Sequence, residues 1–341
     1  MKRRRGILHP QPNLHRLLQY FLPVPLPFGP MASSCASCPL STSLTFAAVA
    51  AGGVALGYYM ASHCAGAVDS GAAASGPVVK VADPKESRDT YEKQQLVNQY
   101  LEFHFAPPSE SFALAREAGI DVTKAYDFPA RLARVAERHS RPDRRSRALD
   151  LGCAVGRTTF ELAHMFKECV GIDLSNGFIT AANTLLRDGR LAFDGPGQGE
   201  RVVPRVALIP TDIDVSRVSF SVGDALAVDP ALGQFDVIIA ANLLCRVPQP
   251  EKLLEALCTR VTVGGIIILA SPYSWWAGAT NPESWLGGTE AKGESADVVK
   301  NILRTKYGME LLTEEPMPFL IRDHPRRFQL GFSHLTVWRR L

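Results

Sequence analysis

Acidic residues are absent from the first 68 of the 341 residues, and no charged residue of either sign lies between Leu17 and Val68. Five of the 37 Lys and Arg residues precede this stretch, so the remainder of the chain, with its 34 Asp and Glu, carries a net charge of −2. A domain that binds nucleic acid usually shows a clustered excess of basic residues. The charge distribution therefore argues against a nucleic-acid-binding domain after residue 68, and the excess of basic residues lies in the N-terminal arm.

The uncharged stretch contains an apolar segment that begins at Leu44 and ends at Ala61. The segment has no proline and is about as long as a helix that crosses a bilayer. Five prolines between residues 23 and 39 exclude a continuous helix before it. We predict a transmembrane helix over 44–61, with a low-complexity or cleaved targeting segment as the alternative.

The orientation of this anchor depends on where the chain starts. A basic cluster over 2–5 would hold the N-terminus in the cytosol. A start at Met31 would instead leave Lys80 and Lys85, after the segment, as the nearest basic residues, and would keep the rest of the chain cytosolic. We expect a single-pass anchor with the main domain in the cytosol. An acid-free leader with Ser and Arg also suits a mitochondrial presequence.

The composition divides the chain into five parts. They are a basic, proline-rich arm over 1–43, the membrane segment over 44–61, a Gly-, Ala- and Pro-containing linker over 62–88, an N-terminal helical cap over 89–140 and a main domain over 141–341. The seven cysteines form no short-spaced disulfide framework, and four of them lie within or beside apolar runs. These four, which we expect in the core, are Cys153, Cys169, Cys245 and Cys258. A reducing compartment is therefore expected.

Short aliphatic runs alternate with helical periodicity in the main domain, a pattern that predicts a parallel sheet with helices on both faces. The predicted strands are 148–151, 169–173, 218–222, 235–240 and 266–270, the helices are 158–165, 177–187 and 251–260, and two further strands are expected near 309–313 and 333–338. The fold class is therefore α/β.

The first predicted strand ends in a glycine-rich turn, Asp-Leu-Gly-Cys-Ala-Val-Gly, that begins at Asp150. Gly152 allows a ligand to approach the backbone, and Gly156 permits a tight entry into the next helix. A dinucleotide fingerprint would need glycine at Ala154 and Arg157, and no Gly-Lys-Ser/Thr phosphate loop is present. The carboxylate of Asp150 suits a ligand that carries an ammonium group better than one that carries a pyrophosphate.

Three later strands also end in polar side chains. Asp173 can accept both hydroxyls of a ribose, Asp224 can accept from an adenine amino group, and Asn242 follows the fourth strand. An Asp at a strand end is often only a turn or capping residue. Four such residues at four consecutive strand ends indicate a nucleoside-type site at the carboxyl edge of the sheet.

This ordered set resembles the class I S-adenosylmethionine-dependent methyltransferases, over about residues 149–339. The resemblance implies a Rossmann-like fold with a seven-stranded, mostly parallel sheet whose last strand is antiparallel, S-adenosylmethionine as cofactor, and direct methyl transfer without a metal. The cofactor-binding residues that it implies are Asp150, Gly152, Cys153, Gly156, Asp173, Leu174, Asp224, Ala225 and Asn242. Ala154 stands where many members have glycine, and its small side chain fits the same turn.

A narrower resemblance rests on blocks outside the cofactor motifs. The blocks are 150–157 (DLGCAVGR), 241–246 (ANLLCR), 271–273 (SPY), 285–288 (WLGG), 317–324 (MPFLIRDH) and 328–338 (FQLGFSHLTVW). With similar residues upstream from 91, they resemble the methyltransferases of ovothiol biosynthesis. That family N-methylates the imidazole of 4-mercaptohistidine (5-thiohistidine). Its often fused iron-dependent sulfoxide synthase domain does not precede this domain, so a separate thiohistidine-producing enzyme is implied.

A mercaptoimidazole amino acid carries a carboxylate, an ammonium group and an acidic thiol. Arg246 and Arg322 can pair with its carboxylate or thiolate through their rigid donor forks. Tyr273 and Trp285 follow the fifth strand, where substrate walls are expected. The full set of candidate substrate-binding residues is Tyr100, Arg246, Tyr273, Trp285, Arg322 and His334.

The candidate catalytic residues are Tyr91, His104 and Asn242. The imidazole nitrogen would attack as a neutral lone pair while its ring proton passes to water, His104 or Tyr91. The competing explanation for Tyr91 and His104 is ordinary helix packing, and for His334 it is a buried histidine of a strand. These alternatives stay open from the sequence.

Other functions share the cofactor motifs. A methyltransferase of another small imidazole, amine or thiol is one alternative, and a non-catalytic, membrane-anchored module that binds S-adenosylmethionine is a second. Methylation of nucleic acid is disfavoured by the charge, and the Asn-Leu-Leu-Cys sequence from Asn242 is not the Asn/Asp-Pro-Pro-aromatic motif of that chemistry.

Overall fold

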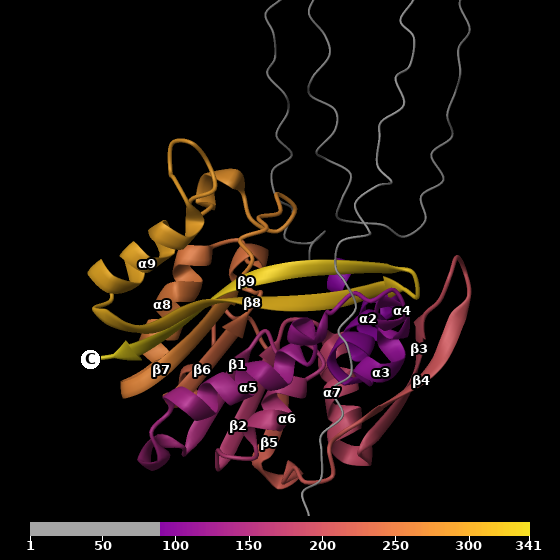
Figure 1. Cartoon of the computed structure of the whole chain (residues 1–341). Coiled ribbons are helices and arrows are strands. Elements are labelled where there is room, and N and C mark those ends of the chain that lie inside the picture. The colour runs from indigo at the N-terminus through magenta and orange to yellow at the C-terminus, as the bar shows by residue number, and fades with distance from the viewer. Residues whose placement is uncertain (1–88) are drawn as a thin grey trace, which may run out of the picture. The chain divides into compact units, whose positions relative to one another are not determined.

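The computed structural model describes residues 89–341 (Figure 1), so the predicted arm over 1–43, the membrane segment over 44–61 and the linker over 62–88 lie outside the described residues. None of the helices within 89–341 combines the length and apolar composition that a bilayer span requires. The longest of them, α7 (Asn176–Asp188), has 13 residues, against the roughly 20 that a span needs.

A seven-stranded sheet forms the centre of the described chain. Its strands are β1 (Arg147–Leu151), β2 (Glu168–Asp173), β5 (Val218–Val222), β6 (Phe235–Ala241), β7 (Val261–Ser271), β8 (Met309–His324) and β9 (Arg327–Arg340). Their order is β5-β2-β1-β6-β7-β9-β8. The first five are parallel, and β9 runs antiparallel to both β7 and β8. The predicted α/β fold with a mostly parallel sheet and an antiparallel last strand is confirmed.

The two C-terminal strands are much longer than the sequence predicted. The expected runs near 309–313 and 333–338 are only parts of a long β8–β9 hairpin that extends toward the N-terminal helices (Figure 1). Pro316 and Pro318 interrupt the apolar pattern of β8. Proline is tolerated in an edge strand because no further strand needs its missing N–H, and β8 is an edge of this sheet.

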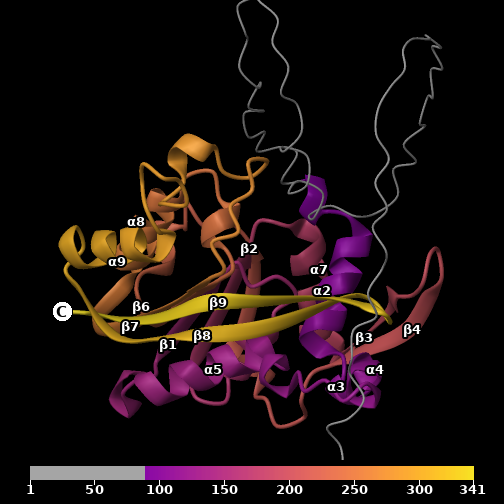
Figure 2. The same ribbon diagram turned by 45° about the horizontal axis from the view of Figure 1, so that its top comes forward.

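Side chains alternate between the two faces of the sheet, as the strand geometry requires. Ala148 and Cys169 belong to the apolar cluster that includes residues of α7 and of two further helices, α5 (Phe128–His139) and α6 (Arg157–Leu162). Leu149 and Val170 belong to the opposite cluster, with α8 (Pro250–Arg260) and α9 (Ser295–Thr305). Figure 2 shows α5 on one side of the sheet and α8 and α9 on the other. The four cysteines expected in the core, Cys153, Cys169, Cys245 and Cys258, are all buried and free.

Two segments outside the sheet pack against each other and against β8. Before α5, the chain forms α2 (Gln94–Phe105), α3 (Pro108–Ser111) and α4 (Ala113–Glu117). A separate antiparallel hairpin, β3 (Arg190–Pro196) with β4 (Val202–Leu208), follows α7 and packs beside α2 (Figure 1). The sequence did not predict this hairpin, because its strands are largely exposed and contain Pro and Gly rather than an alternating apolar pattern.

Candidate functional site

The turn between β1 and α6 is held against β2 by its own backbone. The N–H groups of Gly152 and Cys153 both donate to the carbonyl of Ile172, at 2.8 and 3.1 Å. Gly152 and Gly156 have φ angles of 78° and 89°, which glycine adopts without strain. A Cβ on Gly156 would lie 2.5 Å from the Phe220 ring. The turn therefore presents backbone atoms at the carboxyl edge of the sheet, as predicted for a ligand-binding loop.

Asp150, at the end of β1, lies inside the domain and is only 3% exposed. Its Oδ2 accepts a hydrogen bond from the Thr159 hydroxyl at 2.7 Å. Burial raises the pKa of Asp150 to about 7, and burial likewise raises the pKa of the Cys153 thiol. Both side chains support the turn from within, and a direct contact of either one with a cofactor stays a prediction.

Asp173, at the end of β2, is fixed against the same turn. Its Oδ2 accepts from the backbone N–H of Ala154 at 3.0 Å, and its Oδ1 accepts from that of Ser175 at 2.9 Å. Burial raises the pKa of this carboxyl group, and the backbone N–H donors oppose that shift. Each oxygen keeps a further lone pair that can accept from a ligand hydroxyl. The next residue, Leu174, is 39% exposed and offers an apolar surface beside the carboxylate.

The ends of β5 and β6 differ in how firmly their polar residues are held. Asp224 is exposed, beside the half-buried Ala225, and accepts a hydrogen bond from the backbone two residues on. Asn242 has a φ of 55°. Its N–H donates to the carbonyl of Ala270 at 2.8 Å, and its Oδ1 accepts from the Ser333 hydroxyl at 2.6 Å. A left-handed conformation in a non-glycine residue is strained and recurs at functional sites. Asn242 therefore joins the ends of β6 and β7 to the middle of β9.

The segment before α2 is docked on the start of α7. The Ser175 hydroxyl donates to the Tyr91 carbonyl at 3.0 Å. The carboxylate of Glu92 accepts from the backbone N–H groups of Asn176 and Gly177, at 2.8 and 3.1 Å. An acidic group at a helix N-terminus is stabilised by the unpaired N–H groups there. These contacts bring Tyr91 to the end of β2, within two residues of Asp173.

Tyr100 and His104 lie one helical turn apart on α2. The Tyr100 ring packs on Phe178 with 4.8 Å between ring centroids and on His104 with 5.8 Å. Burial raises the pKa values of both Tyr91 and Tyr100, and the Arg246 guanidinium opposes the shift at both. The structure therefore brings these two phenols and Arg246 into one neighbourhood.

His104 differs from a poised catalytic histidine. Its Nδ1 is buried and has no hydrogen-bond partner in the described part of the chain. Burial, reinforced by Arg157, lowers its pKa to about 3. Its imidazole packs among aromatic rings of α2 rather than facing a proton acceptor or donor. The arrangement favours the packing interpretation of His104 that the sequence left open.

Arg246 is held in place by the loop after β7. Its Nη1 donates to the Cys245 carbonyl at 2.9 Å and contacts the Cys245 Sγ at 3.2 Å. It also donates to the Ser274 carbonyl, and its Nη2 donates to the Ser274 hydroxyl at 3.1 Å. No acidic side chain is among these partners, so the guanidinium charge is held by neutral groups. The structure places this cation near Tyr91 and Tyr100, and its contact with a substrate stays a prediction.

Tyr273 and His334 meet across the sheet. The Tyr273 hydroxyl lies 3.0 Å from the His334 Nδ1. Trp285, in contrast, contacts other residues of the loop after β7. Its ring stacks on Trp275 with centroids 6.2 Å apart, and its Nε1 donates to the Thr280 carbonyl at 2.9 Å. The structure thus joins two of the predicted substrate residues and uses the third to hold the loop after β7.

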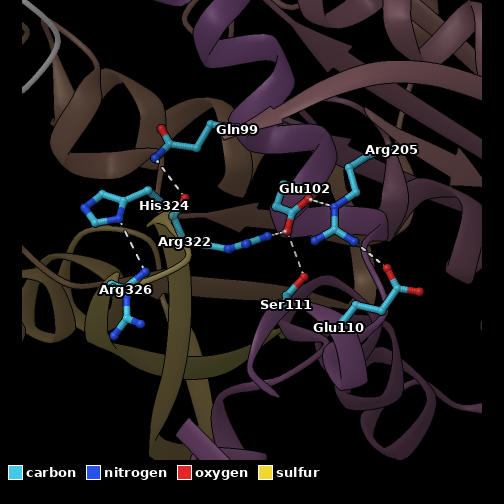
Figure 3. Close-up of polar contacts among 8 residues, drawn as sticks. All are labelled: Gln99, Glu102, Glu110, Ser111, Arg205, Arg322, His324 and Arg326. Carbon is cyan, nitrogen blue, oxygen red and sulfur yellow. Dashed lines mark hydrogen bonds and ion pairs between the residues drawn. The ribbon is translucent and has the colours of Figure 1, made fainter. Parts of the chain in front are cut away.

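Arg322 is a correction to the sequence-based site. Figure 3 shows its guanidinium directed at Glu102 of α2, with 2.5 Å between Nη1 and Oε1. Both side chains are almost fully buried, at 6% and 1% exposure. A cation that is already paired inside the protein is not a ligand for a substrate carboxylate. Sequence reasoning treated Arg322 as an unpaired cation because its partner lies 220 residues away.

Four residues of this region were not assigned from the sequence. They are Glu92, Cys245, Ser274 and Glu314. Cys245 and Ser274 are adjacent to assigned residues, so proximity in the chain was a usable signal. Glu314 lies in a stretch that did not look like a strand beyond residue 313, and its partner His334 is identified only by the β8–β9 pairing.

Comparison with known proteins agrees with the geometry. Residues 149–269 match a family model described as a methyltransferase domain. Over 146 residues, or 40% of this chain, the sequence is 32% identical to the magnesium-protoporphyrin O-methyltransferase of Rhodobacter capsulatus. The match spans about half, 53%, of that relative's length.

Solved structures with some likeness include two methyltransferases. Magnesium protoporphyrin IX methyltransferase from Synechocystis PCC 6803, with bound S-adenosylmethionine, has a TM-score of 0.48 and 12% identity, covering 76% of this chain and 98% of that one. The N-methyltransferase NodS from Bradyrhizobium japonicum WM9 has a TM-score of 0.40 and 17% identity, covering 62% and 96%.

Proposed function

We propose that this chain, a methyltransferase that uses S-adenosylmethionine as its cofactor, methylates a ring nitrogen of a small imidazole thiol such as 5-thiohistidine. The proposal depends mainly on the position of the Arg246 guanidinium. It is held by neutral groups of Cys245 and Ser274 and lies near the phenols of Tyr91 and Tyr100. A cation beside phenols can pair with the carboxylate or with the thiolate of such an acceptor. The resemblance of the sequence blocks outside the cofactor motifs to the ovothiol methyltransferases supports the same acceptor.

The residues at the carboxyl edge of the sheet fit the cofactor. Asp173 has both oxygens oriented by backbone N–H groups and can accept the two ribose hydroxyls. Gly152 has no side chain, and a Cβ there would press on Leu243 at 3.1 Å. Asp224 and Leu174 are exposed at the ends of the neighbouring strands. We assign Asp173 to the ribose, Asp224 to the adenine amino group and the Gly152 turn to the amino-acid part.

When bound, S-adenosylmethionine supplies an electrophilic methyl group, and the carbon–sulfur electron pair stays with its sulfur when the acceptor nitrogen takes the methyl. The chain contributes orientation, which can account for several kcal/mol of the barrier, roughly up to 7–11 in favourable cases. The acceptor thiolate is a competing nucleophile. Arg246 would bind that sulfur through its donor fork and so leave the ring nitrogen as the attacking atom.

A second candidate is methylation of a carboxylate oxygen. The magnesium-protoporphyrin O-methyltransferase that matches 146 residues of this chain is named for O-methylation. In that case Arg246 would orient the acceptor carboxylate itself. A carboxylate has no proton to lose on methylation, whereas a ring N–H does, and this difference separates the two candidates experimentally.

The test is a panel of acceptors given to the full chain with isotopically labelled S-adenosylmethionine. The panel holds 5-thiohistidine, histidine, a small amine, a simple thiol and magnesium protoporphyrin. A labelled product from 5-thiohistidine, with the methyl on nitrogen by NMR, is the expected result. Turnover of magnesium protoporphyrin alone would favour the second candidate. Cofactor binding without product from 5-thiohistidine would refute the proposed acceptor.

We also propose that the segment over 44–61 anchors the chain in a membrane, with the described domain in the cytosol. The proposal rests on the apolar, charge-free composition of that segment. Alkaline extraction of membranes and protease treatment of sealed vesicles, with a tag at the C-terminus, test both parts. Release by alkali would refute the anchor, and a protected tag would refute the orientation. Recovery of the chain inside mitochondria would favour the presequence.

A further inference from the structure

A series of polar contacts joins four side chains, those of Tyr273, His334, Glu314 and Lys300. The Tyr273 hydroxyl lies 3.0 Å from Nδ1 of His334, and the Nε2 of His334 lies 3.1 Å from Oε2 of Glu314. The same carboxylate oxygen is 3.2 Å from the ammonium group of Lys300 on α9, which also lies 3.4 Å from Asp297. The series of contacts thus runs from a phenol through an imidazole to a carboxylate that is paired with a cation.

The order of partners specifies the direction of its hydrogen bonds. A carboxylate can only accept, so the Nε2 of His334 donates to Glu314 in the neutral imidazole. The Nδ1 is then the acceptor, and the Tyr273 hydroxyl donates to it. Lys300 holds the pKa of the Glu314 carboxyl below its usual range, so this carboxylate stays negatively charged. The phenol oxygen of Tyr273 keeps its lone pairs for another donor.

Tyr273 stands at the carboxyl edge of the sheet, where the cofactor-binding residues lie. It lies two residues after the end of β7 and has a φ of 50°, a strained conformation for a side chain of this size. Its backbone N–H donates to the hydroxyl of Ser271 at 3.1 Å. The residue before His334, Ser333, donates to Asn242 at 2.6 Å. The relay and the end of β6 are therefore connected through adjacent residues of β9.

Cys245 connects the loop that carries Tyr273 to Arg246, because its Sγ lies 3.9 Å from the hydroxyl of Ser274, the residue after Tyr273. Burial raises the pKa values of Tyr91, Tyr100 and Tyr273, and Cys245 adds to the shift at all three. Cys245 also contacts Arg246. Cys245 is thus in contact with the cation that we assign to the acceptor and with the residue that follows Tyr273.

We propose that Tyr273, His334 and Glu314 form a proton relay in which Tyr273 takes the ring proton of the methyl acceptor. The inference rests on the proposed function, because only an acceptor that carries an N–H group needs it. Tyr273 is the catalytic residue, and His334 and Glu314 are positioning residues that act through it. The relay replaces His104, whose Nδ1 has no hydrogen-bond partner among residues 89–341.

The proton balance is simple. Once one ring nitrogen has formed its bond to the methyl carbon, the imidazole ring is cationic and still carries an N–H on the other nitrogen. That proton moves to the Tyr273 oxygen as the Tyr273 proton moves to Nδ1 of His334. His334 becomes an imidazolium, which the Glu314 carboxylate stabilises, and it later releases the proton to water. No oxidant, reductant or metal is needed, and the logic is that of a base oriented by a carboxylate.

The kinetic test compares Tyr273→Phe and Glu314→Gln with a matched control, Glu310→Gln. Glu310 lies on the same strand and pairs with Arg339 at 3.2 Å, with a side chain about as exposed as that of Glu314, 45% against 43%. We expect kcat for the N–H acceptor to fall about 100-fold in Tyr273→Phe, the size of a general-base contribution, and about 10-fold in Glu314→Gln. KM for S-adenosylmethionine should stay within twofold, and Glu310→Gln should retain wild-type kcat.

A spectroscopic test does not depend on turnover. Nitrogen-15 NMR of the full chain, with His334 identified by its loss in His334→Gln, should show a neutral imidazole protonated on Nε2. Tyr273→Phe should shift the Nδ1 resonance, and Glu310→Gln should not. The opposite tautomer, or a Glu314→Gln variant with the kcat of the control, would overturn the relay.

The two proposals fail in different ways. If 5-thiohistidine gives no product, the proposed acceptor is refuted. The relay is still supported in that case if His334 is protonated on Nε2 and Tyr273→Phe lowers kcat for another N–H acceptor. Turnover of 5-thiohistidine that is unaffected by Tyr273→Phe would support the acceptor and refute the relay. Activity on a carboxylate acceptor alone would refute both.

Discussion

Glu102 of α2 and Arg322 of β8 form a buried ion pair between parts of the chain that are 220 residues apart. The same carboxylate accepts from the Ser111 hydroxyl at 2.8 Å and lies 3.4 Å from the Nε of Arg205 on β4 (Figure 3). Arg205 in turn pairs with Glu110. One carboxylate therefore joins α2, α3, the β3–β4 hairpin and the β8–β9 hairpin, and it holds the helix that carries Tyr100.

Removal of Arg322 should destabilise the protein strongly. Breaking a buried pair leaves an uncompensated charge, and such losses amount to about 3–5 kcal/mol in the free energy of unfolding. We expect Arg322→Met to show a loss of this size in urea unfolding. Arg327→Met, which removes an exposed partner of Asp323, is the control and should change stability by less than about 1 kcal/mol. Equal stability of the two variants would show that the buried pair contributes little.

Removal of Arg246 should affect the acceptor and not the fold. Its guanidinium is held by the neutral groups of Cys245 and Ser274 and lies beside the Tyr91 phenol. A charged hydrogen bond to an acceptor contributes about 1.5–3 kcal/mol, so Arg246→Ala should raise KM for the acceptor roughly 10- to 100-fold. Steady-state kinetics should show unchanged KM for S-adenosylmethionine, and Arg187→Ala, an exposed arginine beside Asp188, should match the wild type. Full turnover by Arg246→Ala would contradict the assignment.

Substitution of Asp173 should weaken cofactor binding. Both of its oxygens accept backbone hydrogen bonds, and an amide in its place would turn one acceptor into a donor. Asp173→Asn should raise the Kd for S-adenosylmethionine by about tenfold or more, an effect of about 1.4 kcal/mol. Isothermal titration calorimetry measures it, with the exposed Asp188→Asn as the control. An unaltered Kd would exclude Asp173 from the cofactor site.

His104 should make the protein less stable in acid. Its pKa in the folded protein is lowered to about 3 by burial, against an ordinary value of about 6.5. Below pH 6.5 the unfolded chain binds a proton there and the folded chain does not, so the free energy of unfolding falls, by about 2 kcal/mol at pH 5.

The matched variant is His104→Leu, which cannot take up that proton. Urea unfolding at about pH 7.5 and about pH 5 should show a smaller acid loss in the variant than in the wild type. Asp150 acts in the opposite direction, because burial raises its pKa to about 7 and its contribution falls as the pH rises. It is present in both proteins and cancels in the difference. Equal acid losses would mean that His104 is protonated in the folded state.

Local patterns were sufficient for the parts of the site that lie within short stretches. The β1 turn, Asp173 and Asn242 each follow an aliphatic run and precede a helix or loop, so their place at the sheet edge follows from the parallel order of the strands. The same patterns failed for β3 and β4, whose strands are exposed, and for the full length of β8, where Pro316 and Pro318 interrupt the pattern.

The sequence by itself determined the α/β fold with its mostly parallel sheet, and the place of Asp173 and Asn242 at strand ends, because those depend on periodicity and on glycine at a few turns. The tertiary structure decided which polar groups are partners. Arg322 and His334 looked equally suited to a substrate, yet one is paired inside the protein with Glu102 and the other connects Tyr273 to Glu314. Their partners lie far away in the chain, and only strand register and helix docking bring them within hydrogen-bond distance.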